Sequence, residues 1–339
     1  MSKIIKLVEE RNKRPSALDI LTEYISDDLK LVNKIIIQEM QSKVSLIPTL
    51  AGHIVVSGGK RIRPILTLAS AKLCNYEGER QIKLAACVEF IHTATLLHDD
   101  VVDSSILRRG VNTANAIWGN EASVLVGDFL FSRSFQLMVD DSSLSVLRIL
   151  SKASAIIAEG EVHQLLTTNN TSTGEDSYLE VISAKTAALF SAACRIGAVI
   201  ADRPNADEEA LAGFGNNLGI AFQLVDDALD YSSKSRDIGK SIGDDFKEGK
   251  ITLPLILAYR RGDENERSFW HRTINEGNQN EKDVDTAIAL MKKHNTILDT
   301  IKRAQHYGEK AKDALAIFPD SKIKNILMDL VDFCIKRNH

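Results

Sequence analysis

Two aspartate clusters with the same spacing are the residues of this chain best suited to chemistry. The first is Asp99-Asp100-Val101-Val102-Asp103 and the second is Asp226-Asp227-Ala228-Leu229-Asp230. On a helix, residues four apart share a face, so the outer carboxylates of each cluster repel each other. A divalent cation removes this repulsion, and Mg²⁺ favours one or two carboxylates together with waters and phosphate oxygens. The pattern predicts a polyanionic substrate held by Mg²⁺ between two carboxylate-bearing helices.

Cationic residues lie close to both clusters in the sequence. The segment Gly58-Gly59-Lys60-Arg61-Ile62-Arg63-Pro64 places two glycines before three cations. Glycine lets the backbone approach a phosphate, and arginine can bind it through two N–H groups at once. The other cations near the clusters are Arg108, Arg109, Lys185, Lys240 and Lys250. These groups supply the positive charge that a bound polyphosphate requires.

The overall composition narrows the class of protein. The chain has 339 residues, 44% of them hydrophobic, and a net charge of -4, which argues against non-specific nucleic-acid binding. Its four cysteines are scattered without metal-binding spacing, as expected in a reducing cytoplasm. We find no apolar run of membrane-spanning length and no secretory signal. These observations predict a cytoplasmic protein without a transmembrane segment.

The hydrophobic pattern is that of an all-α protein. Apolar residues recur at three- and four-residue spacing, as at Leu84, Cys87, Val88 and Ile91, whereas convincing strand alternation and Asn-Gly hairpins are missing. No boundary divides the chain, so we expect one domain over residues 1–339, with about the first 14 residues frayed. The polar segment Gly262–Glu281 is expected to be a surface connection.

Taken together, these motifs resemble the trans-type isoprenyl diphosphate synthases, and most closely the long-chain octaprenyl and decaprenyl members. The match runs from about Leu46 to Leu257 with order and spacing preserved. The matching segments are GGKRIRP (58–64), EFIHTATLLHDDVVD (89–103), RRG (108–110), SVLVGDF (123–129), AEGE (158–161), AKT (184–186), FQLVDDALDY (222–231) and GKSIGDDFKEGKITLPL (239–255). The resemblance implies a single bundle of about a dozen helices around a deep central cavity, and a homodimer.

The resemblance also implies a role for each site residue. Three Mg²⁺ ions, with substrate bound, would be held against an allylic diphosphate by Asp99, Asp100, Asp103, Asp226, Asp227 and Asp230, which together with Lys185 would be the catalytic residues. The same diphosphate would be contacted by Arg108, Lys185, Thr186, Gln223, Lys240 and Lys250. The diphosphate of isopentenyl diphosphate would be bound by Lys60, Arg63, His92 and Arg109.

The implied reaction is head-to-tail condensation to a long all-trans polyprenyl diphosphate, for a quinone side chain such as that of ubiquinone. Ala94 lies five residues before Asp99, which is about 7.5 Å along a helix. In the family, bulk at this position and the next shortens the product. Because Ala94 and Thr95 are small, we expect an open tunnel and a product of about C40–C50. One departure from long-chain relatives is Ser104-Ser105-Ile106-Leu107, where acidic residues are usual, which predicts less negative charge near the metals.

Several alternatives were weighed against this interpretation. A shorter-chain synthase (C15–C20) shares all the motifs, whereas a class I terpene cyclase shares the first cluster but lacks GGKRIRP. A His-Asp phosphohydrolase would use His53, His92 or His98 as metal ligands, yet the second cluster has no histidine nearby. A di-iron bundle needs a second Glu-x-x-His besides that of Glu89 and His92. A non-catalytic partner subunit would be expected to lack one cluster, and both are complete here.

Overall fold

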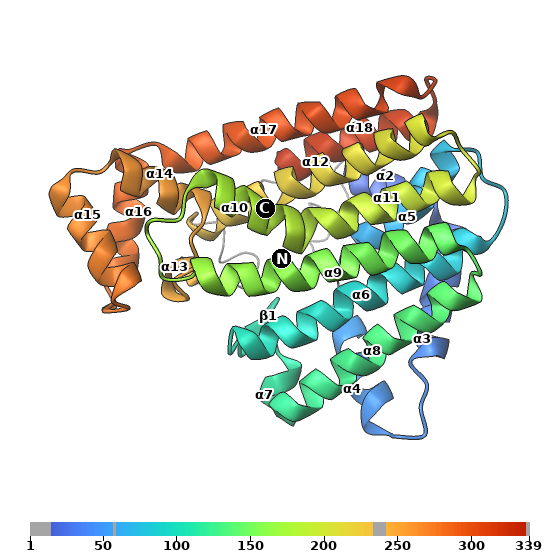
Figure 1. The fold of residues 1–339 in the computed structure, drawn as a ribbon, viewed down its shortest axis with the longest axis horizontal. Helices are drawn as coiled ribbons and strands as arrows, with labels where there is room; N and C mark the ends of the chain where they lie inside the picture. Colours follow the sequence, from blue (N-terminus) through green and yellow to red (C-terminus); the bar gives the residue numbers. More distant parts are fainter. Residues whose placement is uncertain (1–14, 57–58, 233–241, 337–339) are drawn as a thin grey trace, which may run out of the picture.

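The computed structural model describes residues 15–56, 59–232 and 242–336, and its architecture is helical (Figure 1). The first half contains α2 (Ala17–Tyr24), α3 (Ser26–Glu39), α4 (Leu46–Val56), α5 (Ile62–Leu73), α6 (Arg80–Val102), α7 (Ala114–Trp118), α8 (Asn120–Asp140) and α9 (Leu144–Thr167). The second half contains α10 (Glu175–Ile182), α11 (Ala188–Ile200), α12 (Asn205–Asp230), α13 (Asp244–Lys247), α14 (Leu253–Arg261), α15 (Glu264–Trp270), α16 (Asp283–Lys293), α17 (Thr296–Ala314) and α18 (Lys322–Ile335). The all-α prediction is confirmed; the segment expected to fray lies outside the described residues.

Long helices lying side by side form the frame of the bundle. α11 packs against α5, α9 and α12, while α8 packs on α6 and α17 packs on α12, toward opposite edges of the molecule (Figure 1). α6 is buried around most of its circumference, including the consecutive residues 84–88. A helix that is apolar on all sides belongs in a core. The interior position of α6 carries the first aspartate cluster, at its C-terminal end, into the middle of the molecule.

Close contact between α11 and α12 depends on two glycines one turn apart. A Cβ at Gly215 would lie 2.4 Å from the carbonyl oxygen of Phe190, and one at Gly219 would lie 2.6 Å from Cα of Ala187. Both distances are shorter than van der Waals contact, so only glycine permits this approach. The contact fixes α12, which carries the second aspartate cluster, against the segment that contains Lys185.

Two hydrophobic cores are joined by α12. The larger core lies under α2 to α9, α11 and α18 and includes Leu218. The smaller core includes Leu224 and lies under α10 and α13 to α17. In the smaller core Trp270 is fully buried, at the end of α15. The expectation of a surface connection over Gly262–Glu281 is therefore wrong. An Asp263–Glu266 capping box begins a helix there, and the following π-helical turn η3 (His271–Asn275) continues it.

A short hairpin lies between the first aspartate cluster and α7. β1 (Leu107–Arg108) pairs with β2 (Val111–Asn112) in antiparallel register, with Arg108 opposite Val111. The two turn residues, Arg109 and Gly110, have φ angles of 54° and 76°. Left-handed values at both positions define a type I′ turn, in which Asn-Gly is the favoured pair. The sequence did not signal this hairpin, because arginine stands in its turn where asparagine would be the familiar residue.

Within the part of the chain that the structure describes, two helical stretches are long and apolar enough, by length and composition alone, to cross a membrane. They are Asn120–Asp140 and Glu175–Ile200, and 67% of the apolar window of the second is buried inside the fold. Both pack against other helices of the bundle, as core helices do. Only 39% of the first window is buried, so α8 presents an apolar face outward.

Candidate active site

Both aspartate clusters lie at the C-terminal ends of long helices. Asp99 and Asp100 belong to the last turn of α6 and Asp103 is its C-cap, whereas the second cluster ends α12. The C-terminal end of a helix carries partial negative charge, which disfavours further carboxylates and favours a cation. Two clusters with oxygen donors at such ends suit a hard divalent cation such as Mg²⁺.

The segment 245–250 contacts both clusters. The Nζ of Lys250 lies 2.8 Å from Oδ2 of Asp103 and 2.7 Å from Oε2 of Glu248. Burial disfavours the charged amine, but the carboxylates of Asp245, Asp103 and Glu248 outweigh it and raise the pKa of Lys250. The backbone N–H of Asp245 donates to Oδ2 of Asp230 at 3.2 Å. Contact of Lys250 with an allylic diphosphate stays a prediction.

The first cluster is surrounded by mixed charges. Burial and the neighbouring carboxylates of Glu161 and Asp103 raise the pKa of Asp99 to about 7, although Lys185 opposes this. The Nζ of Lys185 lies 2.5 Å from Oε2 of Glu161, and Nη2 of Arg108 lies 2.7 Å from Oδ1 of Asp100. Lys185 and Arg108 thus lie beside the cluster, and their contact with an allylic diphosphate stays a prediction. Glu161 belongs to the matching segment AEGE (158–161), but the sequence alone indicated no role for it.

The second cluster is held by a chain of hydrogen bonds. Thr186 Oγ1 donates to Oε1 of Gln223 at 2.9 Å, and Nε2 of Gln223 donates to Oδ1 of Asp227 at 2.8 Å. The hydroxyl of Tyr178 donates to Oδ2 of the same aspartate at 2.5 Å. Burial and the carboxylate of Asp245 nevertheless raise the pKa of Asp227 to about 7. Tyr178 is a site residue that the sequence did not reveal; its one signal is its place seven residues before Lys185.

Lys185 and Thr186 belong to a π-helical turn. The turn η1 (Ser183–Ala187) interrupts the run from α10 to α11. Such turns are rare and are often found at functional sites, because they rotate side chains away from the ordinary helical register. Here the turn directs Lys185 toward Glu161 on α9 and Thr186 toward Gln223 on α12.

A second group of cations lies beside the first cluster; we call it the basic group and define it as Lys60, Arg61, Arg63, His92 and Arg109. Nη1 of Arg63 donates to Nε2 of His92 at 2.9 Å, and the guanidinium lies 4.8 Å from the centre of the Phe190 ring. Burial, followed by the charges of Arg63 and Arg109, holds the pKa of His92 well below its usual range. Because the guanidinium can only donate, Nε2 of His92 accepts this hydrogen bond, and that nitrogen is not available to a metal ion of a di-iron or phosphohydrolase site.

The hairpin turn separates two neighbouring arginines. Arg108 reaches Asp100, whereas the guanidinium of Arg109 packs against Gly59, where a Cβ would lie 3.0 Å from Nη1. The adjacent Lys60 places Nζ 5.4 Å from the centre of the Phe333 ring of α18. The hairpin thus places Arg108 beside the first aspartate cluster and Arg109 in the basic group, which is the division of roles that the resemblance implies.

The remaining predicted residues occupy the expected elements. Ala94 is buried on α6, one to two turns before Asp99, and the Thr95 hydroxyl donates to the carbonyl of His92 at 2.8 Å. Lys240 lies outside the described residues. In the segment where acidic residues are usual, Ile106 and Leu107 are exposed, and the backbone carbonyl of Ser105 accepts hydrogen bonds from Thr113 and Asn115.

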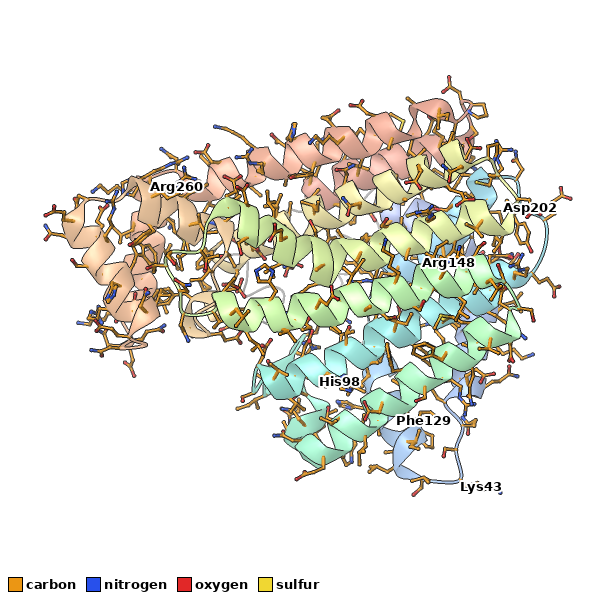
Figure 2. All side chains as sticks on the ribbon, in the orientation of Figure 1. Lys43, His98, Phe129, Arg148, Asp202 and Arg260 are labelled. Atoms are coloured by element: carbon orange, nitrogen blue, oxygen red, sulfur yellow. The ribbon has the colours of Figure 1, made fainter. Side chains whose placement is uncertain are left out.

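Two other histidines considered as metal ligands have protein partners. His98, near the end of α6 in Figure 2, lies 3.3 Å from a carboxylate oxygen of Asp128. His53 Nε2 is 2.8 Å from the carbonyl oxygen of Asn112, and its ring contacts Trp118. Neither arrangement supports a histidine-based metal centre.

The described residues hold no ready-made group of three metal-binding side chains. The carboxylates instead contact Arg108 and Lys250. This arrangement fits a cation that takes only some of its ligands from protein and the rest from substrate and water, as Mg²⁺ does. Asp99, Asp103 and the second cluster offer the oxygen donors for it.

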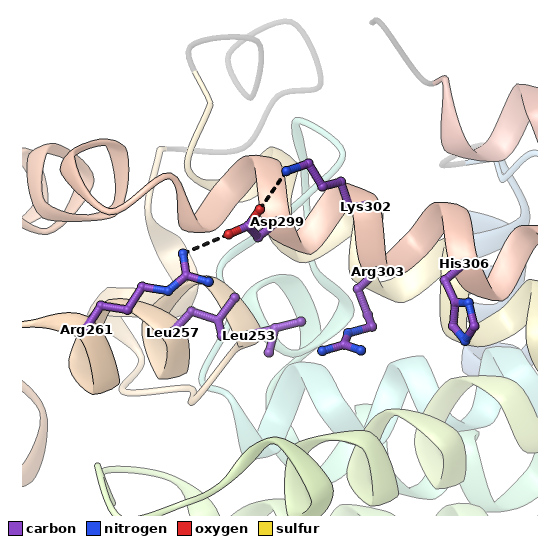
Figure 3. A pocket seen from close by; sticks show the side chains of 7 residues that line it. All are labelled: Leu253, Leu257, Arg261, Asp299, Lys302, Arg303 and His306. Carbon is purple, nitrogen blue, oxygen red and sulfur yellow. Dashed lines mark hydrogen bonds and ion pairs between the residues drawn. The ribbon is translucent and has the colours of Figure 1, made fainter.

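A pocket of about 270 Å³ lies apart from the two aspartate clusters, between α14 and α17 (Figure 3). Leu253 and Leu257 line it, and Asp299 lies 2.8 Å from Arg261 and 3.0 Å from Lys302. The Asp299 carboxylate already neutralises much of the positive charge of Arg261 and Lys302, and we assign the pocket no function. A smaller pocket beside the first cluster is lined by residues that include Leu96, Asp100, Arg108 and Arg109.

The geometry defines a helical enzyme with two facing carboxylate clusters and an adjacent basic group. Residues 44–291 match the model of the polyprenyl synthetase family, and the chain belongs to that family. It is 44% identical to an octaprenyl diphosphate synthase of Haemophilus influenzae over 95% of this chain and 98% of that protein. A decaprenyl diphosphate synthase structure from Rhodobacter capsulatus superposes with a TM-score of 0.91 at 50% identity, covering 95% and 99% of the two chains. A polyprenyl synthase from Caulobacter crescentus, complexed with calcium and isoprenyl diphosphate, superposes with a TM-score of 0.93 at 48% identity, covering 96% and 100%.

Proposed function

We propose that the protein is a Mg²⁺-dependent prenyltransferase that condenses isopentenyl diphosphate head-to-tail onto an allylic diphosphate such as farnesyl diphosphate, giving an all-trans polyprenyl diphosphate of about C40–C50. The observation that carries the proposal is the pair of aspartate clusters linked by the segment 245–250, beside a basic group with no aspartate cluster of its own. That arrangement offers two different diphosphate sites. The long-chain names of the Haemophilus influenzae and Rhodobacter capsulatus proteins described above support the product class.

The two sites divide the chemistry between them. Mg²⁺, which we expect as three ions with substrate bound, would neutralise charge on the allylic diphosphate as it leaves. Lys185, Arg108 and Lys250 lie where they can bind the same diphosphate and stabilise the charge that develops on it. The basic group would hold isopentenyl diphosphate so that its double bond faces the allylic carbon.

The bond changes follow from this placement. The allylic carbon–oxygen bond breaks, the terminal alkene carbon of isopentenyl diphosphate forms the new carbon–carbon bond, and a proton is lost to restore a double bond. The released diphosphate is the base we expect to take that proton. We do not expect Nε2 of His92 to act as the base in this step, because it already accepts a hydrogen bond from Arg63.

Incubation of the purified protein with Mg²⁺, farnesyl diphosphate and labelled isopentenyl diphosphate tests the proposal. We expect a product ladder that ends near C40–C50 on reverse-phase chromatography. A ladder that stops at C15–C20 would overturn the long-chain product, and release of diphosphate without chain extension would overturn the synthase itself. A long product would suit the side chain of a quinone such as ubiquinone.

Replacing Ala94 with a larger residue should shorten the product. Ala94 is buried beneath the first cluster, so the phenyl ring of Ala94→Phe would fill space that the growing tail would occupy. We expect a graded loss of isoprene units along the series Ala94→Val, Ala94→Leu and Ala94→Phe, measured by chromatography of the extracted products. Overpacking alone would instead lower the melting temperature by an amount corresponding to about 1–3 kcal/mol and leave the ladder unchanged, which would contradict the prediction.

We further propose that the protein is a homodimer joined through α8. The outward face of this helix carries Val124, Leu125, Phe135 and Val139, and the rings of Phe131 and Phe135 pack edge to face at 5.2 Å. An apolar face of this extent is typical of a protein interface. The chain is also proposed to form one domain and to reside in the cytoplasm. Its four cysteines support this location, because they are buried and form no disulfide among the described residues.

Leu125→Glu should convert the dimer to a monomer. The side chain is 66% exposed on α8, so the charge costs little in the single chain but would be buried at the interface. Light scattering after gel filtration should give twice the 37.4 kDa chain mass for the parent and one chain mass for the variant. Leu298→Glu is the matched control, because Leu298 is 61% exposed on α17 at the opposite edge of the molecule. Equal masses for parent and Leu125→Glu would contradict the proposed interface.

A further inference from the structure

Glu89 is a carboxylate beside the basic group for which no role has been assigned above. It lies on α6, three residues before His92, and its Oε2 is shielded from solvent with no hydrogen-bond partner among the described residues. Burial raises the pKa of its carboxyl group, and the guanidinium groups of Arg61, Arg63 and Arg109 counteract that rise by favouring the charged form. The basic group therefore contains one built-in anion.

The arginines do not depend on Glu89 for their positions. Arg63 is held by its hydrogen bond to His92 and by the Phe190 ring. Arg109 is fixed by the hairpin turn and packs against Gly59. With geometry set by other contacts, the effect of Glu89 on a bound diphosphate is mainly electrostatic, and two anions that share the same cations oppose each other.

Under the function proposed above, repulsion between Glu89 and a bound diphosphate would assist chain elongation. In each round the diphosphate that leaves is the allylic one, so the diphosphate of isopentenyl diphosphate stays on the lengthened product. Before the next round this diphosphate must move from the basic group to the aspartate clusters. Equally tight binding of the ground state and the transition state does not increase kcat. Tight binding at the basic group would also delay the transfer of the product diphosphate to the aspartate clusters.

We propose that Glu89 is a positioning residue that limits the affinity of the basic group for diphosphate, so that the product can move to the aspartate clusters between condensations. Glu89 touches no reacting atom and acts through Arg63 and Arg109. Removing its charge should tighten diphosphate binding and slow elongation together.

Glu89→Gln tests this inference because it removes the charge and keeps the shape. Binding of inorganic diphosphate by calorimetry, without Mg²⁺, should become about tenfold tighter, as expected for one shielded charge repulsion. In steady state, KM for isopentenyl diphosphate and kcat should both fall, and intermediate-length products should accumulate. Glu89→Asp, which restores the charge, should behave like the parent, and Glu159→Gln, an exposed glutamate on α9, should change nothing.

The alternative outcomes are distinct. Weaker diphosphate binding and a raised KM in Glu89→Gln would show that Glu89 organises the arginines, which would overturn the inference. An unchanged affinity with an unchanged ladder would also overturn it. The calorimetric result does not depend on turnover, so it tests Glu89 even if the parent protein makes no polyprenyl product, whereas that failure would reject the proposed function.

Discussion

Asp99→Asn should lower kcat for chain elongation by about 1,000-fold while leaving the fold at least as stable as the parent. The carboxylate lies among the negative charges of Glu161 and Asp103, and burial already raises its pKa to about 7. Loss of its charge therefore relieves repulsion in the metal-free protein but removes a ligand needed for departure of the diphosphate. We expect Asp226→Asn to reduce kcat to a similar degree.

Incorporation of labelled isopentenyl diphosphate measures the loss of activity, and differential scanning calorimetry measures the stability. Asp140→Asn, at the exposed end of α8, is the matched control and should retain full activity. Turnover within about tenfold of the parent in Asp99→Asn would remove the metal-binding role.

Arg109→Asn should separate substrate binding from stability. A left-handed residue other than glycine costs about 1 kcal/mol, and asparagine adopts this conformation more readily than arginine. The melting temperature should therefore stay the same or rise. Loss of a charged hydrogen-bond donor to diphosphate, however, should raise KM for isopentenyl diphosphate by about 10- to 100-fold.

A KM split between the two substrates checks this second prediction. KM for farnesyl diphosphate should change little, because Arg108 and not Arg109 pairs with the aspartate cluster. Gly110→Ala is a useful comparison, since it strains the same turn without removing a cation and should lower stability. Equal increases in both KM values would mean that the hairpin has moved as a unit and that Arg109 has no separate role.

The main features of the fold and of both aspartate clusters could be predicted because they depend on local patterns. Spacing of three and four residues identified α6, and equal spacing within the two clusters identified their shared chemistry. The family and the long-chain relatives confirmed the class. The roles of individual residues, including Ala94 and Lys60, remain predictions that the experiments above test.

Features that depend on contacts between distant segments could not be predicted from the sequence. Tyr178 reaches Asp227 only because α10 packs beside α12. A tyrosine in an amphipathic helix does not indicate such a contact in the sequence. The π-turn at Lys185 has no established sequence signal, and the hairpin was missed because arginine replaced asparagine in its turn. The capped helix before Trp270 was missed because its exposed residues outnumber its buried ones.

The contact between Lys250 and Asp103 has a consequence for how the protein exists between catalytic cycles. These residues are 147 positions apart in the chain, and their ion pair places a cation of the protein itself beside the first aspartate cluster. An amine that partly neutralises the carboxylates reduces their repulsion without a metal ion, so we expect the chain to fold before it binds Mg²⁺, unlike small domains whose structure forms only around their ion. Under the proposed function, substrate and metal would displace an existing partner instead of assembling the site. The availability of magnesium would then govern the rate of synthesis and not the amount of folded enzyme.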